Sequence, residues 1–272
     1  MQLKLLILQH NKAITLTIKA YLFPIFLGVL FSRLVQPLFF PIEISLFSID
    51  FGHITIFMLT ITATLLFLGK KTVWLWFFLA SSFDQIVYLV IKINPTLGFY
   101  SLYSYIGSII FVIFSAVLFV LISIYSNSTT GIKKEESASF RQKLIYIVTI
   151  LIVIGVSRLL QVIYLNMGIP NEERSLMIMG YEVHHINHGL ILIYISSHIL
   201  YFFSSNNKII KNISLLMLVL GIALINDQIS YYALKEISDE AYLSFVSFIG
   251  AVFVSIIQII LLFSLKLFNY SK

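Results

Sequence analysis

Eight long apolar stretches limit what this chain can fold into. Each is long enough to cross the roughly 30 Å hydrocarbon core of a bilayer as an α-helix. With a mean hydropathy of +0.98 and only 11% charged residues, the 272-residue chain has more apolar surface than a soluble core can bury. We therefore expect an all-α, polytopic membrane protein with spans near residues 14–36, 51–69, 72–91, 100–125, 144–166, 184–204, 213–233 and 242–266.

Three short motifs occur twice in the same order, which indicates an internal duplication. The interval from Asp84 to Gly107 is 23 residues, and so is the interval from Asp227 to Gly250. The matched motifs are SRLVQ (32–36) with SRLLQ (157–161), DQIVY (84–88) with DQISY (227–231), and SYIG (104–107) with SFIG (247–250).

The duplication predicts the domain organisation. Residues 1–126 would form a first four-helix repeat and residues 144–272 a second. The polar stretch at 127–143 would be a cytoplasmic linker between them. Because each repeat has an even number of spans, both would enter the membrane in the same direction, which predicts parallel repeats.

The basic residues predict the orientation in a cell membrane. Of the 18 Lys and Arg residues, 13 fall on one side of the eight-span arrangement and 3 on the other. By the positive-inside rule, that side and both termini would be cytoplasmic. The net charge of +6 then reflects orientation and not nucleic-acid binding.

Each repeat places an Arg and an Asp inside apolar spans, where charged side chains are costly and need partners. We expect Arg33 to pair with Asp84 and Arg158 with Asp227, all at the depth of the outer leaflet. A Gln follows each Arg by one helical turn, as Gln36 and Gln161, and would satisfy remaining donors. Ser32, Ser157, Gly107 and Gly250 suit close helix contacts.

The second repeat also carries a histidine-rich run, YEVHHINHG at 181–189. If the run is helical, His184 and His188 stack at i,i+4, while Glu182, His185 and His188 stack at i,i+3. Such imidazoles with Asp227 or Glu182 would suit Zn²⁺ or Fe²⁺. Solvation at headgroup level and proton handling without a metal stay open as alternatives.

The first repeat has a thinner set of such residues, Asp50, His53 and Asp84. This asymmetry suits one working site and one structural counterpart, or a second and weaker site. His198 lies deeper in the sixth span, and we expect it to be a hydrogen-bonded helix contact.

The run HHINHG, with Asp227 and Gln228 following 38 residues after Gly189, resembles a group of uncharacterised prokaryotic integral membrane proteins. In that group a His-His stretch ending in Gly precedes an Asp-Glu pair. The similarity covers residues 181–233, and this chain has Gln228 where the group has an acid. The resemblance supports the choice of residues and implies no reaction.

Three kinds of function fit these patterns. The first is a metal-dependent, hydrolase-like enzyme on a lipid, lipid-linked or small anionic substrate, with Asp227 or Glu182 as base and Arg158 with Arg33 binding a phosphate or carboxylate. The second is a transporter or proton-coupled channel built from the repeats. The third is a noncatalytic membrane subunit. We favour the enzyme because the spans offer few polar residues in the cytoplasmic half.

Overall fold

The computed structural model describes residues 21–35, 42–44, 47–49, 51–91, 106, 109–117, 139–168, 177–178, 181–182, 184–202, 207–234 and 238–264. Within these ranges the regular secondary structure is helical apart from two short pairs of antiparallel strands. It divides into two compact units, residues 1–37 with 72–134 and residues 38–71 with 135–272. The predicted all-α class is confirmed at this level.

The first unit is built on two packed helices, α2 (Phe23–Val35) and α4 (Trp74–Ile91). Gly28 on α2 lies so close to α4 that an added Cβ would be 2.3 Å from the carbonyl oxygen of Phe77. The rings of Tyr21 and Trp76, both fully buried, meet edge to face with centroids 4.7 Å apart. Small and aromatic side chains together give this pair its close contact.

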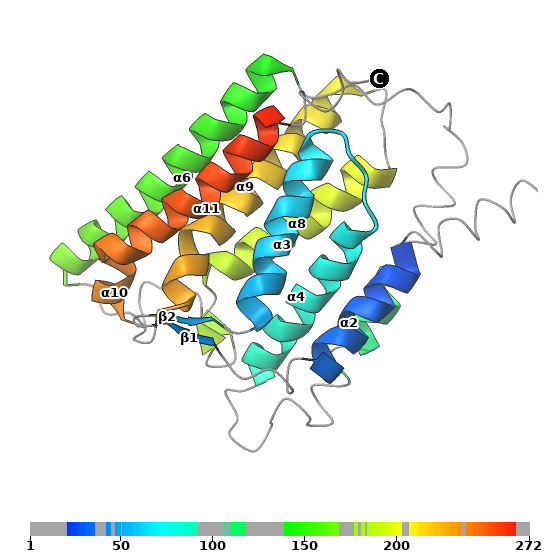
Figure 1. Cartoon of the computed structure of the whole chain (residues 1–272), viewed down its shortest axis with the longest axis horizontal. Helices are drawn as coiled ribbons and strands as arrows, with labels where there is room; N and C mark the ends of the chain where they lie inside the picture. Colours follow the sequence, from blue (N-terminus) through cyan, green and yellow to red (C-terminus); the bar gives the residue numbers. More distant parts are fainter. Residues whose placement is uncertain are drawn as a thin grey trace, which may run out of the picture. The chain divides into compact units, whose positions relative to one another are not determined.

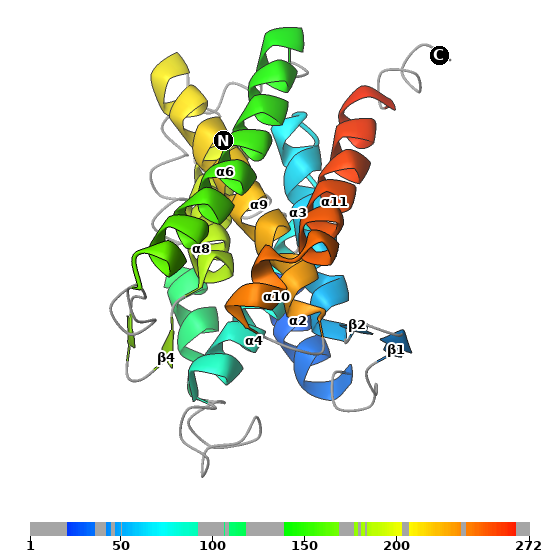
Figure 2. The same cartoon turned by 90° about the vertical axis from the view of Figure 1, so that its left-hand side faces the viewer.

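The second unit surrounds helix α9, which packs against α3, α6, α8 and α11 (Figures 1 and 2). Consistent with this central position, most of the C-terminal half of α9 is buried, including every residue from Ile225 to Tyr231. The elements of the unit are β1 (Ile42–Ile44), β2 (Phe47–Ile49), α3 (Phe51–Phe67), α6 (Phe140–Asn166), β3 (Met177–Ile178), β4 (Tyr181–Glu182), α8 (His185–Phe202), α9 (Lys208–Tyr232), α10 (Asp239–Leu243) and α11 (Phe245–Ser264).

Local sequence signals begin the two longest helices. At the start of α6, the Ser139 hydroxyl accepts a hydrogen bond from the Gln142 N–H (3.3 Å), and the Gln142 side chain accepts one from the Ser139 N–H (2.8 Å). This reciprocal capping box provides acceptors for two N–H groups that have no partner within the helix. At the start of α9, Asn207 Oδ1 accepts the N–H of Ile209 at 3.0 Å. Both starts are therefore fixed by the adjacent sequence.

Three of the described helices, α6, α9 and α11, are long and apolar enough to cross a membrane. Two shorter apolar helices cover Phe23–Leu34 and Gly52–Phe67. Their length and composition indicate a membrane protein. The other predicted spans stay predictions, and the one near 100–125 lies largely outside the described residues.

Helix α3 belongs to the second compact unit, although it precedes the predicted linker at 127–143 in sequence. The compact units divide the chain differently from the sequence repeats, and the repeat boundaries at 1–126 and 144–272 stay a prediction. Helix α3 belongs to the second unit because it packs along α9 and α11 and forms side-chain hydrogen bonds to Tyr146 and Gln258.

The histidine-rich run is not helical throughout, which corrects one premise of the metal hypothesis. Strand β4 pairs with β3, with Glu182 opposite Met177, so Glu182 lies in an extended segment. Helix α8 begins only at His185. The predicted stacking of Glu182 with His185 and His188 at helical spacing is therefore wrong.

Glycines let α8 and α9 approach closely. An added Cβ at Gly189 would lie 2.7 Å from the carbonyl oxygen of Gly221, and one at Gly221 would lie 2.7 Å from that of Gly189. A Cβ at Gly250 would likewise meet Ser230 Cβ at 2.4 Å, which confirms the predicted close contact there. The backbones at the α8–α9 crossing leave no room for a side chain.

We predict that Gly189→Ala lowers the free energy of unfolding in detergent by about 1–3 kcal/mol, because the new methyl group forces α8 away from α9. Helicity followed by circular dichroism during denaturation measures the change. Gly155→Ala in α6 is the matched control, since its added Cβ meets no described atom within 4 Å apart from the adjoining residues and backbone of its own helix. Equal loss of stability in both variants would contradict this account of the crossing.

Candidate functional site

A buried ion pair between α6 and α9 forms the centre of the candidate site. Arg158 Nε donates to Asp227 Oδ1 at 3.0 Å, and the Asp227 side chain is fully buried. Arg158 also donates through Nη1 to the carbonyl oxygen of Tyr242 (2.7 Å) and through Nη2 to Ser247 Oγ (3.0 Å) and the carbonyl oxygen of Asp227 (3.2 Å). The predicted pair is confirmed, and the Arg158 donors are directed into the protein.

The first unit contains a matching pair between α2 and α4. Arg33 donates to Asp84 Oδ1 through Nε at 3.0 Å and through Nη2 at 2.8 Å. Both residues are buried. This prediction is also confirmed, so each sequence repeat joins its Arg helix to its Asp helix by one buried ion pair.

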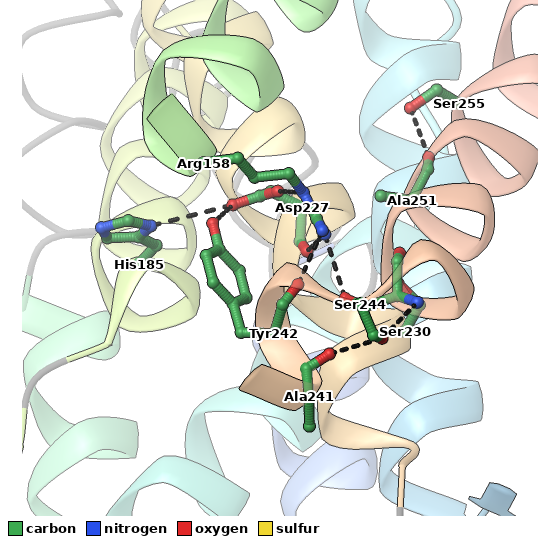
Figure 3. A network of polar contacts seen from close by, with 10 residues as sticks. Arg158, His185, Asp227, Ser230, Ala241, Tyr242, Ser244, Ala251 and Ser255 are labelled. Carbon is green, nitrogen blue, oxygen red and sulfur yellow. Dashed lines mark hydrogen bonds and ion pairs between the residues drawn. The ribbon is translucent and has the colours of Figure 1, made fainter. Parts of the chain in front are cut away.

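Tyr242 completes the surroundings of Asp227. Its hydroxyl donates to Asp227 Oδ2, while the Arg158 guanidinium carbon lies 4.7 Å from the centroid of its ring (Figure 3). The short helix α10 holds this tyrosine, and Gln161 Nε2 of α6 donates to Asp239 Oδ1 in the first turn of α10 at 2.7 Å. Sequence reasoning missed Tyr242, whose position as the first residue of the predicted span 242–266 carried no specific signal.

His185 reaches the same carboxylate from α8. Its Nδ1 lies 3.9 Å from Asp227 Oδ2, a distance within ion-pair range but longer than a hydrogen bond (Figure 3). That nitrogen is buried and has no hydrogen-bond partner among the described residues. The side chain as a whole is 43% exposed. His185 thus links a buried carboxylate to the surface of the unit.

Gln228 fixes the start of α8 beside Asp227. Its Oε1 accepts the N–H of Ile186 at 3.0 Å, one of the first N–H groups of α8 that have no partner within the helix. Consecutive residues of the DQ motif therefore have separate tasks. Asp227 holds α6, and Gln228 holds the end of α8 that carries His185.

The other histidines of the run lie apart from this pair. His188 is exposed, and its Nδ1 is 3.2 Å from the carbonyl oxygen of His184. The His184 ring meets Tyr232 edge to face. Within the described ranges, no three His, Cys, Asp or Glu side chains are grouped to hold a metal ion. The structure brings one of the three histidines to Asp227, so the expected convergence of at least two is not seen.

His198 is buried, with Nδ1 2.7 Å from the carbonyl oxygen of Tyr194, which confirms the expected helix contact. His53 lies in the first turn of α3 and is partly exposed. Gln36 and Asp50 lie outside the described residues.

Comparison with known proteins adds no relative: no family model, curated protein or solved structure matches this chain. The assignment of function therefore depends on the residues and geometry described above.

We predict that Asp84→Ala lowers the free energy of unfolding in detergent by about 3–5 kcal/mol, because Arg33 loses the buried carboxylate that neutralises it. Chemical denaturation of the purified protein measures the loss. The double variant Arg33→Met, Asp84→Leu should recover most of it, since no charge is then left buried. An unchanged single variant would show that this pair is not coupled to folding.

Proposed function

We propose that this chain is a multi-pass membrane enzyme that performs acid–base chemistry on a lipid or lipid-linked substrate at the outer leaflet. In this proposal His185 transfers the proton and Asp227 orients its ring. The observation that supports it is the placement of one imidazole, with Nδ1 buried against Asp227 and the rest of the side chain half-exposed.

The geometry suits a general base because the two nitrogens of an imidazole have distinct tasks. A carboxylate that accepts the Nδ1 proton fixes the tautomer and leaves Nε2 free to take a proton from a substrate. The 3.9 Å separation is compatible with this role, since such contacts are often long without substrate and shorten in the complex. Arg158 and Tyr242 then act by holding the Asp227 carboxylate in place.

The roles of some predicted catalytic residues change with this geometry. Arg158 donates to three residues of its own unit, so we assign it to the support of Asp227 and not to the binding of substrate. Glu182 lies in β4, and we assign it no role as a base. A bound Zn²⁺ or Fe²⁺ at His184, His185, His188 and Asp227 stays an untested hypothesis that the experiment below distinguishes.

For the membrane arrangement, we propose eight spans in two parallel four-helix repeats with cytoplasmic termini. The three long apolar helices and the matched ion pairs of the two halves support it. In this arrangement His185 opens toward the outer side. The basic residues Lys208 and Lys211 at the start of α9 then lie on the cytoplasmic side.

Proton-coupled transport is the second candidate, and one observation favours it. Asn226, Gln258 and Thr60 form a buried hydrogen-bonded cluster on α9, α11 and α3. Polar side chains are therefore not confined to the surroundings of Asp227. The expectation that the cytoplasmic half of the spans offers few polar residues stays a prediction, since these contacts do not test it.

We predict opposite labelling of two single-cysteine variants, Lys208→Cys and Glu240→Cys. Both positions are exposed, and the chain has no cysteine of its own. A membrane-impermeant maleimide should label Glu240→Cys in intact cells and Lys208→Cys only after permeabilisation. Labelling of both from the same side would overturn the proposed orientation of α9 and α10.

We further predict that expressing the protein changes the abundance of a lipid or lipid-linked species, and that His185→Ala and Asp227→Asn both abolish the change. Mass spectrometry of extracted lipids, with equal amounts of each variant in the membrane, measures it. His188→Ala is the matched control, because it removes an exposed imidazole from the same helix.

The outcomes separate the hypotheses. A change that survives in His188→Ala supports the metal-free pair. Loss of the change in all three variants, together with loss of stoichiometric Zn or Fe from purified protein, supports the metal hypothesis. A change that survives in Asp227→Asn would contradict the proposed role of the carboxylate, and no change with the unaltered protein would favour transport.

A further inference from the structure

The second unit holds a cluster of buried polar side chains that the candidate site does not use. Its members come from α3, α6, α9 and α11 and are nearly or completely inaccessible to solvent: Thr60, Thr64, Tyr146, Asn226, Ser255 and Gln258. In a membrane-spanning unit, such groups are costly to leave without partners. These six satisfy one another, so the cluster holds their helices in one arrangement.

Gln258 is the centre of this cluster. Its Nε2 donates to Thr60 Oγ1 at 2.9 Å and to Asn226 Oδ1 at 3.0 Å. Its Oε1 accepts from Asn226 Nδ2 at 2.8 Å and from Tyr146 OH at 3.2 Å. The two amides are thus paired in both directions, and a shift of either breaks two hydrogen bonds at once.

Asn226 immediately precedes Asp227 on α9. Successive residues of a helix point about 100° apart, so the two side chains leave α9 in different directions. Asn226 is held by Gln258 and Ser255 of α11, while Asp227 is held by Arg158 of α6. Rotating α9 to improve one set of contacts would break the other.

We propose that Asn226 and Gln258 are positioning residues for the pair of Asp227 and His185, and that Thr60 completes them. A helix from the first sequence repeat would then set the geometry of the site in the second. The inference rests on the proposed function, in that the Asp227 carboxylate must select the His185 tautomer. The cluster fixes the rotation of α9 about its own axis, and the direction of the Asp227 carboxylate toward His185 depends on that rotation.

Nitrogen NMR of the full-length protein labelled with ¹⁵N-histidine reads the tautomer directly, with the signal of His185 assigned by its loss in His185→Gln. Spectra are taken at a pH where the imidazole is neutral. In the unaltered protein the proton should reside mainly on Nδ1, facing Asp227. Asp227→Asn should shift the population toward Nε2–H, which tests the pair itself.

Thr60→Val tests the positioning. It keeps the shape of the side chain and removes the hydroxyl that Gln258 Nε2 binds, so we expect the Nδ1–H form of His185 to fall from the major to the minor population. Thr60→Ser, which keeps the hydroxyl, should preserve it. Thr62→Val is the matched control, because the Thr62 hydroxyl bonds only to carbonyls of its own helix among the described residues.

The two proposals fail in different ways. If Asp227→Asn changes the tautomer and Thr60→Val does not, the pair stands and the positioning role is wrong. If Thr62→Val acts as strongly as Thr60→Val, the effect is general destabilisation of α3, and the positioning role is again wrong. If Asp227→Asn leaves the tautomer unchanged, the proposed acid–base pair itself is wrong.

Discussion

The pairing of a buried guanidinium with a buried carboxylate is the interaction on which the rest of this structure depends. Neither charge is stable alone in an apolar interior, so Arg158 requires Asp227 and thereby brings α6 to α9. The contacts of Tyr242 and His185 with the site follow from where that carboxylate lies. Tyr242 and His185 approach Oδ2, the oxygen that Arg158 Nε leaves free.

The two ion pairs could be predicted from sequence because their reason is local and strong. An Arg and an Asp in each repeat had few other possible partners inside apolar spans. The predicted histidine cluster is wrong because the prediction assumed one continuous helix through residues 181–189. Gly180, between two short apolar or aromatic runs, is a turn signal that points instead to the hairpin of β3 and β4. The contact of Tyr242 with Asp227 depends on how α10 packs against the other helices, and the periodicity of the sequence does not predict that packing.

The cluster around Gln258 shows a further limit of sequence reasoning. Single threonine, asparagine and glutamine residues in apolar segments do not form a recognisable sequence motif. Their role here depends on hydrogen-bond partners that lie on four different helices. The Gln258 contact with Thr60 lies within the second compact unit, although Thr60 precedes the predicted linker in sequence and Gln258 follows it. The predicted duplication therefore does not by itself say which helices pack together.

The distance in sequence between Thr60 and Gln258, 198 residues, has a consequence for biogenesis. In the proposed membrane arrangement, α3 is synthesised and inserted long before α11, so its hydroxyls need other partners in the lipid until then. They have them: Thr60 Oγ1 donates to the carbonyl oxygen of Phe57 at 2.8 Å, and Thr64 Oγ1 to that of Thr60 at 2.8 Å. The hydroxyls of α3 are therefore hydrogen-bonded before Tyr146 and Gln258 are synthesised. Afterwards Thr60 Oγ1 also accepts from Gln258 Nε2, and Thr64 Oγ1 also bonds to the Tyr146 hydroxyl.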